Sequence, residues 1–394
     1  MATSTKILTL NSGSSSLKFA IYRVAPEERL VFSGKLGRIG LAGGRVEISG
    51  EGFESLEESR DLPDHASAIR VVFDHLQERN LADDLSGIGH RVVMGGPHHV
   101  APQRVMPELM RELRELSRID PPHLPAAIKT IEAAQKFRAG ISQVACFDTS
   151  FHRTMPKVAQ TYALPRALVE RLGIIRYGFH GLSYEYILSE LRRIDPARSE
   201  GKVIVAHLGN GASMAAIRAG HSVETTMGFT PAGGLVMSSR PGDLDPGVLV
   251  HLLTQKQMSG SELNNLIYKK SGLLGVSNFS SDMQDLTREK DANPQVLEAI
   301  DLFCYQVRKS LGALAAVLDG VETLVFTGGI GENSPFVRER ICQDFSYLGL
   351  LVAPEKNAAH AGIISAPESR VIVRVMKTNE ELMIARHTGK LLND

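Results

Sequence analysis

The sequence predicts an α/β protein that is built from two related halves. Strand-like and helix-like segments alternate through most of the chain, which is typical of this fold class. Two β-prone runs, 7–10 and 17–22, flank a Gly/Ser turn and predict a hairpin. The segment 202–220 repeats this pattern at an offset of 196 residues, which places Lys6 on Lys202. A repeat of this kind, nearly half a chain away, predicts two halves of related structure.

The other elements follow from periodicity and from residues that favour the ends of helices. Pro107 stands where a proline commonly begins a helix, with Glu108 beside it. We expect helices over 65–79, 107–118, 243–270, 294–318 and from about residue 379, and strands over 144–151, 324–327 and 371–376. These elements predict an N-terminal domain of residues 1–150, completed by the helix 379–394, and a second domain of residues 151–378.

The composition excludes several classes of protein. Of the 394 residues, 43% are hydrophobic, enough for sizeable cores, and Lys+Arg and Asp+Glu both number 44. A balanced charge offers no overall attraction for nucleic acid or for an anionic membrane, so we expect neither as a partner. Cys146, Cys304 and Cys342 are far apart and odd in number, which argues against disulfides and zinc. The absence of a signal-peptide pattern and of a long apolar run predicts a cytoplasmic protein.

Three glycine-rich turns suggest where a nucleotide binds. They occupy 11–16, 209–211 and 328–331, and each follows or connects a strand. Glycine lets the main chain approach a ligand closely and leaves N–H groups free to bind anions. None of the turns has the P-loop or the GxGxxG spacing. One such turn alone is more often only a tight turn, so the inference depends on there being three.

Nine segments, in this order, make the chain similar to the acetate kinase family: LNSGSSSLKF, HRVVMGG, CFDTSFH, RYGFHG, HLGNGAS, MGFTPAGGLVMSSRPGDLDP, KKSGLLGVSNFSSDM, FTGGIGENSPFVR and TNEELMIAR. They are distributed over nearly the whole chain. The resemblance implies two actin-like domains of the sugar-kinase superfamily, a ribonuclease H-like fold, with the active site in a cleft between them. It also implies a homodimer that transfers a phosphoryl group from ATP to acetate, with Mg²⁺, or Mn²⁺ as the alternative metal.

The resemblance implies five catalytic residues. Arg91 and Arg240 are placed near the transferring phosphoryl group, whose spread negative charge suits guanidinium forks. His180 corresponds to a histidine that stabilises the transition state, and His123 to a second active-site histidine. Asp148 corresponds to a residue described as a proton acceptor. The acceptor carboxylate is already ionised at neutral pH, with a pKa of about 4–5 by analogy with side-chain carboxyl groups, so we expect Asp148 to orient an arginine or a Mg²⁺-bound water instead.

The resemblance also implies the binding residues. Asn11 and Glu380 are expected at Mg²⁺, with Glu381 as the alternative to Glu380. A small acceptor pocket is expected, with an apolar wall of Val93, Pro122, Phe179 and Pro231 and with Arg91 as its charged member. At the expected adenosine wall, no bulky side chain replaces Gly329 or Ile330, so ATP fits better than pyrophosphate as the phosphoryl donor. The full set expected at ATP or ADP is Lys18, His207, Leu208, Gly209, Asn210, Gly211, Asp282, Met283, Gln284, Gly329, Ile330, Gly331, Glu332 and Asn333.

Six positions differ from the family pattern: Met94, Pro122, Leu124, Leu182, Tyr184 and Gln284. All are expected near the site, so they bear on acceptor preference and nucleotide affinity. The alternatives are a kinase of propionate or of another short-chain carboxylate and, in a different class, a nucleotide-binding sensor without catalytic activity. The arginines and His180 argue against the sensor. The segments HRVVMGG and MGFTP argue against a kinase of butyrate or of a sugar in the same superfamily. A screen of acids and sugars as phosphoryl acceptors separates the alternatives.

Overall fold

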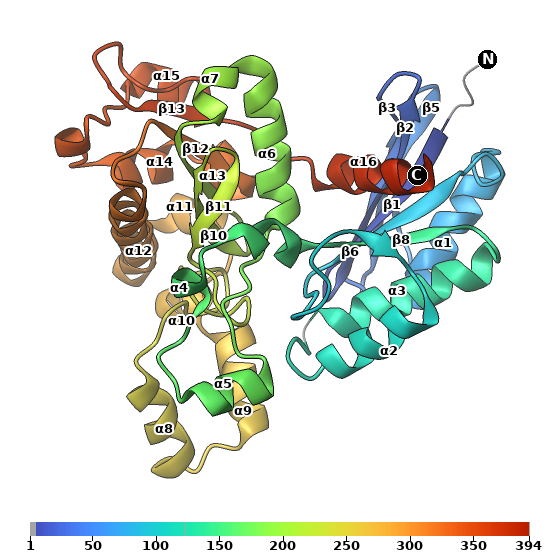
Figure 1. The fold of residues 1–394 in the computed structure, drawn as a ribbon, viewed down its shortest axis with the longest axis horizontal. Helices are drawn as coiled ribbons and strands as arrows, with labels where there is room; N and C mark the ends of the chain where they lie inside the picture. The colour runs from blue at the N-terminus through green and yellow to red at the C-terminus, as the bar shows by residue number, and fades with distance from the viewer. Residues whose placement is uncertain (1–4, 122, 394) are drawn as a thin grey trace. The chain divides into compact units, whose positions relative to one another are not determined.

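The computed structural model describes residues 5–121 and 123–393, and the chain divides into two compact units. Unit 1 comprises Met1–Ser150 and Asn379–Asp394, and unit 2 comprises Phe151–Thr378. Each unit contains one mixed β-sheet with helices packed against it (Figure 1). The predicted α/β fold class is therefore confirmed.

Unit 1 is built on an eight-stranded sheet with the order β5-β4-β3-β2-β1-β6-β8-β7. Strand β1 pairs antiparallel with β2, as the predicted hairpin requires, and parallel with β6, which is in turn parallel to β8. The strands are β1 Thr5–Ser12, β2 Ser16–Ala25, β3 Arg29–Gly37, β4 Arg45–Gly50, β5 Phe53–Ser59, β6 Gly87–Val92, β7 Gln103–Arg104 and β8 Gln143–Phe147.

Helices cover both faces of this sheet. The helices are α1 His65–Glu78, α2 Pro107–Leu116, α3 Leu124–Phe137 and α16 Glu380–Asn393. Side chains of α1 and α3 join Leu8, Leu10 and Ile88 in one core. The alternate residue Gly89 turns to the other face, where the position of a Cβ atom is occupied by Thr388 and Ile384 of α16. Helix α16 contacts β1, β2, β6 and β8, so it completes the unit from the far end of the sequence (Figure 1).

Unit 2 is built on a five-stranded sheet with the order β11-β10-β9-β12-β13. Helix α6 packs on one set of strand residues, including Val203 and Val205, and the long helix α12 also contacts β9, β10 and β11. The strands are β9 Lys202–Leu208, β10 Ala212–Arg218, β11 His221–Thr225, β12 Thr323–Thr327 and β13 Ile372–Val375.

The helices of unit 2 are α4 Lys157–Gln160, α5 Arg166–Leu172, α6 Gly181–Ile194, α7 Pro196–Ser199, α8 Pro246–Thr254, α9 Gly260–Asn265, α10 Gly272–Ser277, α11 Met283–Glu289, α12 Pro294–Leu318, α13 Gly328–Asn333, α14 Pro335–Cys342 and α15 Pro354–Ala358. Short 3₁₀ segments cover Asp148–Thr154 and Ser346–Leu348, and a π-helical turn covers Leu266–Lys270. The single helix expected over 243–270 is thus divided into α8, α9 and the π-helical turn.

The two sheets share one topology. The order β3-β2-β1-β6-β8 in unit 1 corresponds to β11-β10-β9-β12-β13 in unit 2, with the same antiparallel and parallel pairings. The repeat read from the sequence therefore reflects duplicated structure. At the same offset of 196, Asn11 near the end of β1 corresponds to His207 near the end of β9.

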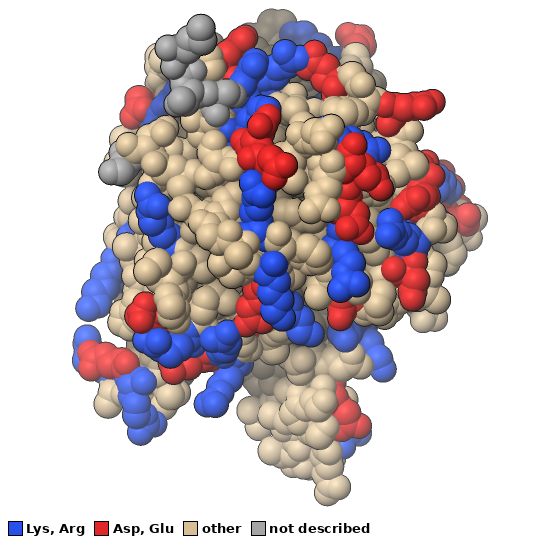
Figure 2. All heavy atoms as spheres, turned by 90° about the vertical axis from the view of Figure 1, so that its right-hand side faces the viewer, with Lys and Arg blue, Asp and Glu red and all other residues tan. Residues whose placement is uncertain are grey.

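The balanced charge of the chain is visible on its surface. Figure 2 shows one face, on which Lys and Arg side chains alternate with Asp and Glu. No helix among residues 5–121 and 123–393 is both long enough and apolar enough to cross a membrane.

Candidate active site

In unit 1 the predicted residues gather at one edge of the sheet. Strands β1, β6 and β8 are parallel to one another, so their carboxyl ends lie at the same edge, where α/β proteins commonly bind ligands. Asn11 lies near the end of β1, Arg91 near the end of β6, and Asp148 directly after β8. Glu380, the first residue of α16, joins them.

Arg91 is the centre of this cluster. Its Nε donates to Asp148 Oδ1 at 2.9 Å and its Nη2 donates to Asp148 Oδ2 at 2.6 Å, so the pair is bidentate. Its Nη1 lies 3.1 Å from Glu380 Oε2 and donates to Asn11 Oδ1 at 3.2 Å. Burial opposes the guanidinium charge, but attraction to Asp148 and then to Glu380 outweighs it and raises the pKa of Arg91 above its ordinary value. Arg91 is therefore a fixed and permanent cation.

The side-chain oxygens near Asn11 are of the kind that Mg²⁺ prefers. Asn11 Nδ2 donates to Glu380 Oε2 and to Glu381 Oε1, each at 3.0 Å, so both carboxylates lie at the same place. Among the residues that the structure describes, no group of three or more His, Cys, Asp and Glu side chains could hold a metal ion. Amide and carboxylate oxygens nevertheless suit Mg²⁺, which keeps several waters and is often held by one or two carboxylates plus phosphate oxygens.

The other residues predicted in unit 1 have different surroundings from the cluster around Arg91. His123 precedes α3, and its Nδ1 donates to Asp120 Oδ1 at 2.7 Å. Val93 is buried, whereas Lys18 is exposed on β2 directly opposite Asn11 in the hairpin. Lys18 and Glu381 both line a depression of about 700 Å³ on the face of β2–β5. Pro122 lies outside the described residues.

In unit 2, Arg240 and His180 face the same small space. A Cβ atom at Gly211 would stand 2.8 Å from Arg240 Nη2 and 3.0 Å from His180 Nε2, so only glycine leaves that space open. Arg240 Nη1 donates to the carbonyl of Pro231 at 2.6 Å, which anchors one side of its guanidinium group. His180 has a positive φ of 59° and directly precedes α6.

Two histidines of unit 2 are stacked, and each is held by a serine. The rings of His180 and His207 lie 4.2 Å apart and nearly parallel. His180 Nδ1 is hydrogen-bonded to Ser213 Oγ, and His207 Nδ1 to Ser183 Oγ, both at 2.8 Å. A serine hydroxyl thus orients each of the two rings through its Nδ1 atom. Phe179, the residue before His180, is fully buried.

The glycine runs 209–211 and 328–331 lie side by side at the end of the unit 2 sheet. Strands β9 and β12 are parallel neighbours, and the Cβ position of Gly209 is 3.7 Å from Gly329 N. A Cβ atom at Gly329 would meet no heavy atom within 4 Å, so the surface there is open. The run 328–331 was expected to be a turn, but it forms the start of α13. Gly328 turns the chain out of the strand with a φ of 77°, and its N–H donates to the Glu332 carboxylate at 2.9 Å.

The remaining predicted nucleotide residues lie at the start of α11. The Asp282 side chain accepts from Gln284 N at 2.7 Å and so caps the helix, while Met283 is buried in the core. Leu208 is buried, and its main chain is packed against Gly328. Asn333 Nδ2 donates to Gly329 O at 2.9 Å.

Sequence reasoning did not identify Arg338, which supports this region from within. Arg338 is fully buried, and its Nη1 donates to the carbonyl oxygens of Gly331 and Glu332, both at 2.9 Å. Its other donors bind Asn357. Arg338 lies inside the segment FTGGIGENSPFVR, but no pattern in the sequence marks it as buried. Ser183 and Ser213 were likewise missed, because a serine close to a glycine has the sequence pattern of a turn residue.

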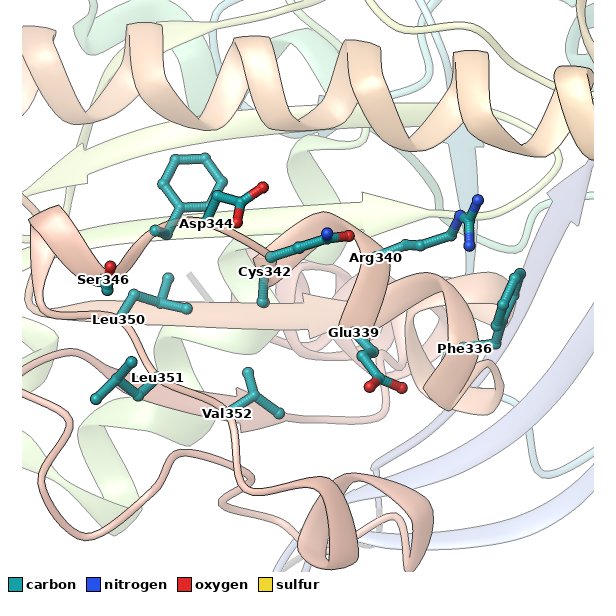
Figure 3. Close-up of a pocket in the computed structure, with 11 residues that line it drawn as sticks. Phe336, Glu339, Arg340, Cys342, Asp344, Ser346, Leu350, Leu351 and Val352 are labelled. Carbon is teal, nitrogen blue, oxygen red and sulfur yellow. The ribbon is translucent and has the colours of Figure 1, made fainter.

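A separate pocket of about 630 Å³ lies beside α14 (Figure 3). Its lining residues lie between Phe336 and Val352, and none of them was predicted for the site. Its lining includes the apolar residues Cys342 and Leu350 and the acidic residues Glu339 and Asp344.

The chain is similar to known proteins over nearly its whole length. The family model of the acetokinase family matches residues 6–386. An acetate kinase of Rhodopseudomonas palustris is 44% identical, with 98% of each chain covered. The crystal structure of Porphyromonas gingivalis acetate kinase has a TM-score of 0.88 at 36% identity, covering 98% of this chain and 100% of that one. A propionate kinase from Francisella tularensis has a TM-score of 0.92 at 32% identity, covering 97% and 98%. The chain therefore belongs to the acetokinase family, a family of acetate kinase enzymes.

Proposed function

We propose that this enzyme transfers the γ-phosphoryl group of ATP directly to the carboxylate of acetate, giving acetyl phosphate and ADP, and that the reaction is reversible. One observation carries the proposal most directly. The guanidinium group of Arg240 and the imidazole Nε2 of His180 face a space that only a glycine, Gly211, leaves open. Two hydrogen-bond donors around such a space suit a phosphoryl group, whose equatorial oxygens carry spread negative charge.

Arg91 is proposed as a second cation for the phosphoryl or carboxylate oxygens. A bidentate carboxylate fixes its guanidinium plane, and a planar fork that is already oriented loses little freedom when it binds an anion. His123 is proposed as a further donor in the site, with its ring oriented by the buried carboxylate of Asp120.

The reaction needs no general base. The acceptor carboxylate has a pKa of about 4–5, by analogy with side-chain carboxyl groups, and is ionised at neutral pH, so it carries no proton to remove. One carboxylate oxygen forms the new bond to phosphorus while the bond from phosphorus to the ADP oxygen breaks, and ADP leaves with that electron pair. Both oxygens of Asp148 are engaged by Arg91, which supports an orienting role for this residue.

The nucleotide is proposed to bind along the glycine runs of unit 2. The segment 207–211 and the segment 329–333 are neighbours, and the open surface at Gly329 leaves room for an adenosine group. Asp282–Gln284 at the start of α11 and Lys18 in unit 1 complete the proposed set.

Mg²⁺ is proposed at Asn11 and Glu380, with Glu381 as the alternative carboxylate. The metal would neutralise charge on the phosphate oxygens, as it does in other phosphoryl transfers. The two carboxylates that meet Asn11 Nδ2 supply oxygen atoms of the right type. Mn²⁺ has the same preference for oxygen ligands and is the expected substitute.

The acceptor is the finer part of the proposal. Val93, Phe179 and Pro231 are buried, and we propose them, with Pro122, as the residues that limit acceptor size. One methylene group changes binding in an apolar pocket by only about 1–3 kcal/mol, so propionate is the second candidate acceptor. The likeness to a propionate kinase structure favours including it.

A hydroxamate assay of acyl phosphate formation tests the proposal. The purified protein is given ATP and Mg²⁺ with acetate, propionate or butyrate, and kcat/KM is compared among the acids. The highest value with acetate supports the assignment, and the highest value with propionate assigns the second candidate. No acyl phosphate from any of the three acids would refute the proposal.

We also propose that the enzyme is a cytoplasmic homodimer. Helix α8 supports self-association, since it is strongly apolar and none of its residues is buried within the chain. Val248, Val250 and Leu253 are each more than 40% exposed. Exposed apolar residues that are close together commonly mark an interface. A light-scattering mass of one chain would contradict the dimer.

A further inference from the structure

A hydrogen-bonded chain of hydroxyl groups leads from the interior of unit 2 to His180. The Nδ1 atom of His180 is 2.8 Å from Ser213 Oγ, and Ser213 Oγ is in turn hydrogen-bonded to the phenol of Tyr184. Ser213 and Tyr184 are both fully buried. Ser213 lies on β10 and Tyr184 lies on α6, so two rigid elements hold the three groups together.

The proton positions in this chain follow from the chemistry of the groups. A phenol is far more acidic than an aliphatic hydroxyl, so Tyr184 is the better donor and Ser213 Oγ accepts from it. The one hydroxyl proton of Ser213 is then directed to His180 Nδ1, which must accept. A neutral imidazole that accepts at one nitrogen carries its proton on the other. The proton of His180 therefore lies on Nε2, the atom that faces the space at Gly211.

The surroundings also favour a neutral ring. His207 is stacked on His180 at 4.2 Å, and the guanidinium group of Arg240 faces the same space as His180 Nε2. A second positive charge so close to an arginine, and stacked on another histidine, is disfavoured. His180 can thus donate a hydrogen bond as a neutral ring, without being an imidazolium ion.

We propose that Tyr184 is a positioning residue that, through Ser213, holds His180 as the neutral tautomer with its proton on Nε2. In this state the ring donates to an oxygen of the transferring phosphoryl group, and its Nδ1 is satisfied by Ser213. The inference rests on the proposed function for the role of that hydrogen bond, but the tautomer itself is a property of the resting protein.

The first test measures the tautomer without any substrate. The full-length protein is labelled with ¹⁵N-histidine, and the His180 ring signals are assigned by their loss in His180→Asn. The wild type should show one neutral tautomer, protonated on Nε2, and Tyr184→Phe should show a mixture of both. Tyr177→Phe is the matched control, because Tyr177 is equally buried but its hydroxyl donates to the Gly173 carbonyl. A wild-type ring that is protonated on Nδ1, or on both nitrogens at neutral pH, would overturn the proposal.

The second test asks whether Tyr184 acts through Ser213. Loss of one neutral hydrogen bond predicts that Tyr184→Phe lowers kcat about threefold to tenfold. In a Ser213→Ala background, Tyr184→Phe should change kcat no further, because the connecting hydroxyl is already absent. Equal losses with and without Ser213 would refute the connection. If the tautomer is as expected but His180→Asn keeps full turnover, the proposed role of His180 fails while the tautomer assignment stands.

Discussion

Replacing Asp148 by asparagine should lower turnover by loosening Arg91. The carboxylate of Asp148 is fully buried, and both of its oxygens accept hydrogen bonds from the Arg91 guanidinium group. Asparagine keeps one acceptor oxygen but loses the charge and the bidentate geometry. A hydrogen bond to a charged group contributes about 1.5–3 kcal/mol. If that energy is needed to hold Arg91 for the transition state, kcat should fall about 10- to 150-fold.

The assay is initial-rate acetyl phosphate formation over a range of pH and Mg²⁺ concentration. If Asp148 only orients Arg91, the residual activity of Asp148→Asn should keep the pH dependence of the wild type. Raised Mg²⁺ should recover part of the lost turnover, because Glu380, a proposed Mg²⁺ ligand, also contacts Arg91. Asp84→Asn is the matched control, because it removes an exposed carboxylate that pairs with Lys6 in the same unit. Its kcat should equal that of the wild type.

Two results would refute this reasoning. An acidic limb of the wild-type pH profile that disappears in Asp148→Asn, without any Mg²⁺ effect, would show that Asp148 acts as a base. Unchanged kcat in Asp148→Asn would show that the orientation of Arg91 does not depend on this carboxylate.

Three further predictions concern other parts of the molecule. Arg240→Ala should lower kcat by about 10³-fold while ATP still binds, and near-normal turnover would remove it from the mechanism. Gly211→Ala should lower kcat with little change in thermal stability, because its Cβ displaces only the ends of side chains; loss of folding would contradict this. Burial lowers the pKa of His90 and of His152 to about 4. The unfolded chain therefore takes up protons first on acidification, and the unfolding free energy should fall by about 2 kcal/mol for each between about pH 7.5 and about pH 5. Urea unfolding should show a smaller fall in His90→Gln, and an equal fall in that variant would contradict the assignment.

Strand and helix patterns in the sequence were sufficient to predict the fold class. The hairpin at 7–22 and the repeat at 202–220 could be read because apolar runs around small residues form a strong local signal. Helix α13 could not be read in this way. Its glycines are poor helix formers, and the helix is stabilised by the Glu332 carboxylate and the buried Arg338, which are contacts that periodicity does not reveal.

The residues of the candidate site were predicted from family motifs more than from the chemistry and spacing of the residues themselves. The position of Arg91 near the end of a strand was readable, but its bidentate contact with Asp148 depends on the parallel pairing of β6 and β8. Ser213 carries no signal of its own, because a serine has many structural uses, and Tyr184 was noted only as a departure from the family pattern. Their relation to His180 exists only once β10 and α6 are packed together.

The return of α16 to unit 1 has a consequence for how the protein is made. Residues 379–394 leave the ribosome only after all of 151–378, yet they cover the face of β6 on which Gly89 meets Thr388. During synthesis that face has no cover, although unit 2 already has every strand of its own sheet. Unit 2 can therefore fold first, and the nascent unit 1 is the part that exposes an apolar sheet surface to chaperones. Glu380, a proposed metal ligand, arrives with the same helix, so the proposed Mg²⁺ site is assembled only in the last stage of folding.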